Sequence, residues 1–167
     1  MGLFGLALAA FALAPAASAL ACPGADADAS STSRRTYART VECVVNTQRV
    51  QNGLVPLIHD SSLARAAWRF SRAMVLKRFF GHVSPEGSTP DERARAAGYD
   101  GGGLAETIGW GSGSFATPAA IVDQWMHSPP HRAIILTPEF RYVGLGVASG
   151  SPAGVPAGAT VTADFGT

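Results

Sequence analysis

Apolar residues recur at helical spacing through the first half of the chain. Between residues 37 and 48 they lie on one side of a helix that Gly53 ends. A second apolar stripe follows Asp60 and Ser61, which are both favourable helix caps. This stripe consists of Leu63, Ala67, Phe70 and Met74. The pattern predicts two amphipathic helices, each with one buried face.

Three further helices are predicted from their capping residues. The segment "TPDER" is a capping box, with Thr89 as the cap, Pro90 at the first helical position and Glu92 three residues after the cap. Residues 117–118 repeat the Thr-Pro start of this helix. The Ser-Pro-Pro segment at 128–130 ends the fourth helix and starts a fifth.

Strands are predicted only in the last part of the chain. Residues 142–147 alternate large apolar residues with Gly144 and Gly146, and residues 160–165 return antiparallel after a Gly/Pro-rich turn region. A short third strand is predicted at 106–111. Because strands and helices do not alternate, the sequence favours an α+β fold in which helices pack on an antiparallel sheet.

The N-terminal segment is apolar and uncharged. Residues 1–21 contain an apolar stretch, a helix-breaking Pro15 and then small residues that fit a signal-cleavage site, so we interpret them as a signal peptide. Two alternatives stay open, a retained membrane anchor and a lipid-modified Cys22. We therefore predict a protein that is secreted and extracellular, with membrane contact only if this segment is kept as an anchor.

The rest of the chain is long enough for one domain. Residues 22–36 form a polar N-terminal arm, in which 24–33 are predicted to be a disordered linker, and residues 37–167 form the folded domain. The 13 basic and 12 acidic residues nearly balance. No cluster of basic residues with interleaved aromatics is present, which argues against nucleic-acid binding.

Cys22 and Cys43 are the only cysteines in the sequence. In an exported chain such a pair predicts one disulfide, here between the arm and the first helix, whereas two free thiols would remain in a reducing compartment. A disulfide would use both sulfur atoms, so a cysteine nucleophile is not expected.

Five segments, in order, resemble the CAP superfamily (cysteine-rich secretory, antigen 5 and pathogenesis-related-1 proteins) in its bacterial single-domain form. They are "NTQRVQNGLVPL", "FFGHVSPEG", "LAETIGWG", "WMHSPPHRAIIL" and "RYVGLGV", with "TADFG" at the end. The resemblance covers about Cys43 to Gly166. It implies an α-β-α sandwich, with helices packed around a small three-stranded antiparallel sheet, and a cleft lined by histidine and acidic residues.

The resemblance implies three site residues in this sequence. His82 in "GHVSP" matches the first family histidine, Glu106 in "AET" the first acid, and His131 the histidine of the bacterial Ser-Pro-x-His-Arg segment. Ser128 stands where eukaryotic members have a second glutamate, so their four-residue cleft does not transfer whole. His131 would lie at a helix N-terminus, where the helix dipole favours the neutral ring.

Four interpretations of these residues are open at this point. The favoured one is a non-enzymatic, secreted module that binds a small apolar ligand, an extended ligand or an extracellular partner protein. A second is a divalent-metal site, with Zn²⁺ held by His82, His131 and Glu106. A third is hydrolysis, with Glu106 as base or a serine–histidine pair, although no complete catalytic set is evident. The fourth is a structural His82–Glu106 pair without a ligand.

Overall fold

The structure is a computed structural model that describes residues 21–167. The predicted signal peptide thus lies almost wholly outside the described residues. The first two predicted helices are present, α1 at Arg34–Gln51 and α2 at Ser61–Lys77. The Asp60 carboxylate accepts hydrogen bonds from the backbone N–H groups of Ser62 and Leu63, which makes it the predicted cap of α2.

The three later helices also form where their caps predict them. They are α3 at Pro90–Ala96, α4 at Pro118–His127 and α5 at Pro129–Ile135, and a short 3₁₀ helix, η1, covers Gly113–Ala116. The Thr89 hydroxyl accepts from Glu92 N, and the Glu92 carboxylate accepts from Thr89 N, which confirms the capping box.

The sheet contains one strand more than predicted. The three predicted strands are β2 at Leu104–Ser112, β3 at Tyr142–Ser149 and β4 at Gly158–Gly166, and they pair antiparallel. A two-residue strand, β1 at Ile58–His59, adds to β3 in parallel, giving the order β1-β3-β4-β2. Two residues carry no periodic signal, so only their contact with β3 defines this strand.

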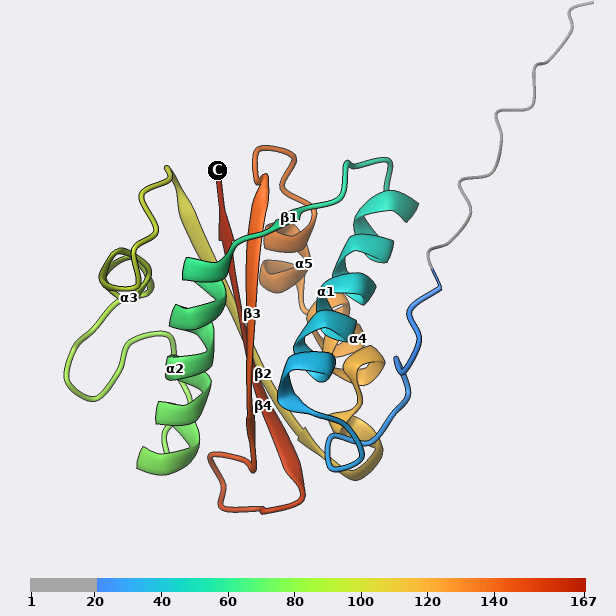
Figure 1. Cartoon of the computed structure of the whole chain (residues 1–167), viewed down its shortest axis with the longest axis vertical. Helices are drawn as coiled ribbons and strands as arrows, with labels where there is room; N and C mark the ends of the chain where they lie inside the picture. The colour runs from blue at the N-terminus through green and yellow to red at the C-terminus, as the bar shows by residue number, and fades with distance from the viewer. Residues whose placement is uncertain (1–20) are drawn as a thin grey trace, which may run out of the picture.

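Helices cover both faces of the sheet (Figure 1), as the predicted α-β-α sandwich requires. The α2 and α3 helices lie on one face, and α1, α4 and α5 lie on the other. Val143, Leu145 and Val147 belong to the core on the α1 face. Gly144 and Gly146 face α2, and a Cβ atom at either glycine would overlap the α2 backbone. These two glycines therefore allow α2 to pack directly on β3.

A fully buried arginine joins α1 to the end of α5. Arg49 is in the last turn of α1 and has no exposed surface. Its guanidinium donates hydrogen bonds to four backbone carbonyls, at distances of 2.8 to 3.3 Å. The acceptors belong to Val55, Ile135, Thr137 and Phe140. One side chain thus holds the loop after α1 and the segment after α5 in place.

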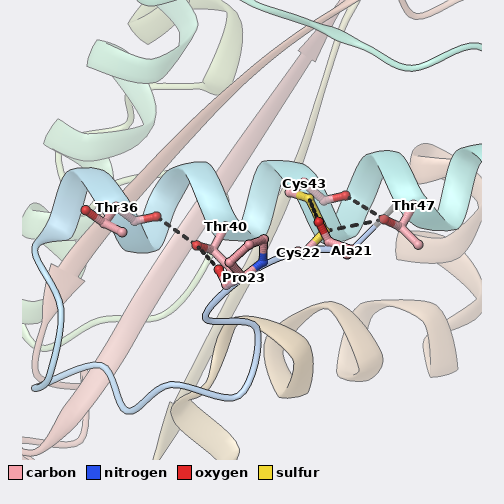
Figure 2. Close-up of a disulfide and its surroundings, with 7 residues drawn as sticks. All are labelled: Ala21, Cys22, Pro23, Thr36, Thr40, Cys43 and Thr47. Atoms are coloured by element: carbon pink, nitrogen blue, oxygen red, sulfur yellow. Dashed lines mark hydrogen bonds between the residues drawn. A yellow bond between two sulfur atoms is a disulfide. The ribbon is translucent and has the colours of Figure 1, made fainter. Parts of the chain in front are cut away.

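The N-terminal arm is attached to the domain rather than disordered (Figure 2). Cys22 and Cys43 form the predicted disulfide, which ties the arm to the middle of α1. The Ala25 carbonyl accepts from Ala119 N of α4 at 2.8 Å, and Ala29 packs against the core. The prediction of a disordered linker over 24–33 was therefore wrong. The disulfide spans 21 positions and stabilises the fold by about 3 kcal/mol in the chain-entropy estimate.

Candidate functional site

The three predicted site residues come from three separate segments of the fold. His82 lies in the loop between α2 and α3, Glu106 is in β2, and His131 is in the first turn of α5. His82 bonds Glu106 directly. The charge of His82 contributes to lowering the pKa of His131. We refer to His82, Glu106 and His131 as the histidine–glutamate cluster.

Glu106 is the fixed centre of this cluster. Its side chain is 1% exposed, and its two carboxylate oxygens accept from two different donors. His82 Nδ1 lies 2.8 Å from Oε1, and a guanidinium N–H of Arg93 donates to Oε2 at 2.6 Å. A carboxylate can only accept, so the His82 ring carries a proton on Nδ1 and directs Nε2 away from Glu106. The His82 side chain is 48% exposed, so this imidazole is available at the surface.

Arg93 is held in position by contacts of its own. Its guanidinium lies over the Phe70 ring, 3.3 Å from the ring centroid. It also donates to the Ser88 carbonyl at 2.7 Å. Stacking on an aromatic face and a fork of donors are both typical of arginine at a buried carboxylate. Arg93 therefore anchors Glu106 from α3, while Phe70 supports Arg93 from α2.

A second carboxyl group is buried beside Glu106. Asp164 of β4 pairs in register with Glu106 of β2 and is 1% exposed. Its Oδ1 has no hydrogen-bond partner among residues 21–167. Burial, and then the negative charge of Glu106, raise the pKa of the Asp164 carboxyl well above its usual value, against the opposing effect of Arg93. The surroundings of Asp164 thus favour its protonated form, whereas the Glu106 carboxylate is paired with Arg93.

The raised pKa of Asp164 has a consequence for stability. Above about pH 4, the folded state retains a proton that the unfolded state loses, so the contribution of Asp164 to stability falls as pH rises toward its folded pKa. Asp164→Asn removes this effect. We expect the variant to melt a few degrees above the parent at neutral pH, since about 1 kcal/mol corresponds to roughly 2–4 °C in a domain of this size.

Thermal melts across the acid-to-neutral range test this prediction. The melting-temperature difference between Asp164→Asn and the parent should be smallest at acid pH and grow toward neutral pH. Asp28→Asn, at an exposed position in the N-terminal arm, is the control that should show no such trend. A difference that is constant with pH would contradict a raised pKa of Asp164.

His131 is half-buried, and its proton affinity is reduced. Burial, and then the charge of His82, lower the pKa of His131 below its ordinary value. The sequence also predicted a neutral ring, but from the dipole of the helix. The structure gives desolvation and the neighbouring histidine as the causes.

The cluster does not fit a three-ligand zinc site. Within residues 21–167, no group of three or more His, Cys, Asp or Glu side chains is placed to hold a metal ion. Both oxygens of Glu106 already accept hydrogen bonds, from His82 and Arg93. A zinc ligand set of His82, His131 and Glu106 would therefore require Glu106 to leave Arg93.

The two remaining histidines lie outside the cluster. His59 in β1 is bonded to Glu42 of α1, with 2.8 Å between Nδ1 and Oε2. His127, at the end of α4, is exposed and lies 2.9 Å from the Asp123 carbonyl through Nδ1. These two rings serve as internal references for any measurement on the cluster.

Sequence reasoning missed Arg93 and Asp164. Arg93 follows the acidic residue of a capping box, so its position predicts an exposed helix residue. Asp164 offered one usable signal, since it stands between Ala163 and Phe165 in a strand of largely apolar residues. A charged residue inside a buried strand indicates a paired or neutral side chain.

Comparison with known proteins places this chain in a family. Residues 44–165 match CAP, the cysteine-rich secretory protein family. The chain belongs to this family.

Its CAP domain is similar to an uncharacterized protein, YkwD, of Bacillus subtilis, with 35% identity over 116 residues. That match covers 69% of this chain and 44% of the relative. A second relative is the uncharacterized membrane protein YlbC of the same organism, at 28% identity over 62% of this chain and 29% of the relative. The chain thus spans less than half the length of these curated relatives.

Solved structures share the CAP fold. An extracellular protein containing an SCP domain from Bacillus anthracis has a TM-score of 0.70 at 22% identity, over 80% of this chain and 41% of that one. An outer surface protein from Borrelia burgdorferi has a TM-score of 0.69 at 16% identity, over 81% and 96% of the two chains. In the part of this CAP protein that the structure describes, no helix is both long and apolar enough to cross a membrane.

Proposed function

We propose that this CAP protein is an extracellular, non-enzymatic binding module whose histidine–glutamate cluster contacts a small ligand. The observation that supports this proposal most is the difference in exposure between Glu106 and His82. Glu106 is buried and doubly bonded, whereas the His82 ring that it orients is half-exposed. A carboxylate held in this way positions an imidazole and is not available as a general base. The disulfide and the extracellular and outer-surface neighbours support a location outside the cell.

The ligand class follows from what surrounds His82. Phe80 and Val83, in the same loop as His82, are 49% and 53% exposed, so this loop presents apolar side chains to solvent. The neutral ring offers a lone pair on Nε2, which accepts a hydrogen bond. We therefore favour a small, mainly apolar ligand with one hydrogen-bond donor.

The contacts of Ser84 do not favour the hydrolase alternative. Ser84 lies two residues from His82, but its hydroxyl bonds the backbone N–H and the hydroxyl of Ser88, at 3.1 and 2.9 Å. A serine nucleophile needs its hydroxyl within reach of the histidine. The contacts of Ser84 thus favour binding over a hydrolysis that uses Ser84 as nucleophile.

Histidine ring NMR tests this proposal. We expect a titration with dodecanol, a long-chain alcohol with one donor, to shift the ring signals of His82 and His131 saturably. The signals of His59 and His127 should not move. In His82→Ala the response of His131 should be lost. The melting temperature should fall only slightly, because a half-exposed hydrogen bond contributes about 1 kcal/mol.

Two outcomes would contradict the proposal. If no ring responds and His82→Ala strongly lowers the melting temperature, the cluster is a structural pair. If Zn²⁺ alone shifts His82 and His131 while dodecanol does not, the cluster is a metal site. His127→Ala, at an exposed histidine outside the cluster, is the matched control.

A further inference from the structure

One edge of the sheet is covered along only part of its length. β1 pairs with Tyr142 and Val143, the first two residues of β3, and the chain leaves the sheet at Asp60 to start α2. Among the residues that the structure describes, 21–167, β3 has a neighbouring strand from Gly144 to Ser149 only on the β4 side. Figure 1 shows this edge of β3 between α2 and α1.

The backbone groups on the uncovered edge can be assigned from the ladder. Asp60 N donates to the Val143 carbonyl at 2.9 Å, so the Val143 groups point toward β1. Every second residue of a strand points its N–H and C=O to the same side, so those of Leu145 and Val147 also point to the uncovered edge. Within residues 21–167 these four groups have no hydrogen-bond partner. Unpaired groups of this kind are a template for another strand.

A groove lies over this edge. It has a volume of about 590 Å³, its walls are the first half of α1 and the first half of α2, and Leu145, Gly146 and Val147 form its floor. Ala38 and Ala64 line the two walls with small side chains, and Trp68 of α2 is 37% exposed. β1 pairs with the same edge of β3, so this edge already binds one strand within the fold.

The groove is positively charged. Four arginines line it, which are Arg34, Arg35, Arg39 and Arg65. Among the described residues that line the groove, Glu42 is the one acidic residue, and its carboxylate is bonded to His59. The lining arginines therefore exceed the acid by three charges. An occupant that pairs with the strand edge must also carry negative charge.

We propose that this groove binds an extended peptide segment with acidic side chains, which adds to β3 as a further strand in the line of β1. Backbone bonds to Leu145 and Val147 would supply the pairing, and the arginines would select the acidic side chains. Pairing of two copies of this chain through the same edge would bring the arginines of both copies together, which disfavours a second copy as the occupant. The site is separate from the histidine–glutamate cluster and does not depend on its function.

Hydrogen exchange on the intact, disulfide-bonded chain tests the pairing. The probe is a nine-residue peptide of alternating threonine and glutamate. On its addition, we expect the amides of Leu145 and Val147 to exchange at least about tenfold more slowly. The amides of Gly144 and Gly146 point to β4 and should not change, which makes them controls within the same strand.

Fluorescence anisotropy with the labelled peptide tests the charge requirement. Arg35→Glu combined with Arg39→Glu should weaken binding by at least about tenfold, and a threonine–lysine peptide should not bind. Arg72→Glu is the matched control, on α2 but outside the groove lining. Failure of the acidic peptide to bind would overturn the proposal. Binding of the peptide without slower exchange at Leu145 and Val147 would also overturn it, as would polyacrylate binding as tightly as the peptide. A third contrary result would be slower exchange of these two amides when the protein concentration is raised without peptide.

Discussion

Arg49→Met is expected to lower the free energy of unfolding by about 3–5 kcal/mol. The substitution retains an unbranched side chain of similar length but removes every donor. Four backbone carbonyls would then be left without their arginine partner in the interior. Each such group costs about 1–3 kcal/mol, part of which water entry or relaxation recovers.

Methionine cannot compensate for the lost hydrogen bonds, because the acceptors are main-chain carbonyls. Where both members of a buried ion pair are replaced by apolar residues, the loss can be small. Here the partners are main-chain carbonyls, which no substitution can remove. Because one of these carbonyls is that of Ile135 at the end of α5, the variant should also loosen the helix that carries His131.

Urea unfolding measures this effect directly. The variant should unfold at much lower urea concentration than the parent, with a similar dependence on denaturant. Arg35→Met, at an exposed position on the same helix, should change stability by less than about 0.5 kcal/mol. Arg49→Lys should lie between parent and Arg49→Met, because an ammonium group cannot reach four carbonyls in the fork geometry of a guanidinium. An Arg49→Met variant as stable as the parent would refute this role.

The second large effect is expected at Glu106. Glu106→Gln should destabilise the fold by about 2–3 kcal/mol, because it removes the negative charge between Arg93 and His82. Arg93 would remain largely buried, at 12% exposure of its side chain, without a charged partner. The amide has only one acceptor oxygen, so it can serve one of the two donors.

The chain contains a matched control for this substitution. Glu42 and His59 form a second glutamate–histidine contact, also at 2.8 Å, in which the glutamate side chain is 12% exposed rather than 1%. Glu42→Gln should therefore cost less than about 1 kcal/mol. Equal losses in the two variants, measured by urea unfolding, would show that Arg93 adds nothing to the cluster.

The Asp164→Asn substitution should have a smaller effect in the Glu106→Gln background than in the parent, because the neighbouring negative charge is gone.

The groove and the cluster lie in different parts of the fold. The cluster is built on the α2 face of the sheet from a loop and β2, with Arg93 of α3 bonded to Glu106, and His131 belongs to α5. The groove lies along the part of β3 that β1 does not cover, between α1 and α2. Because β2 and β3 lie on opposite sides of β4, variants at one site should leave the other intact.

The amino-acid sequence alone determined most of the secondary structure. The helices at α1 and α2 follow from their apolar stripes, and the start of α3 follows from the Thr89 capping box. The disulfide followed from the cysteine count, and His82 with Glu106 followed from segments that resemble the CAP family. These features depend on residues close in the chain or on motifs of fixed order, so they can be recognised without the fold.

The tertiary structure alone decided how the charged residues are used. Arg49 and Arg93 look like ordinary charged positions in the sequence, and their roles depend on partners up to 91 positions away. The place of Asp164 beside Glu106 likewise arises only from the pairing of β2 with β4. The same holds for β1, a strand of two residues that exists only because β3 lies beside it, and for the open edge that begins where β1 ends. Burial and pairing are properties of the packed chain, and a charge acquires an unusual energy only when packing removes it from water.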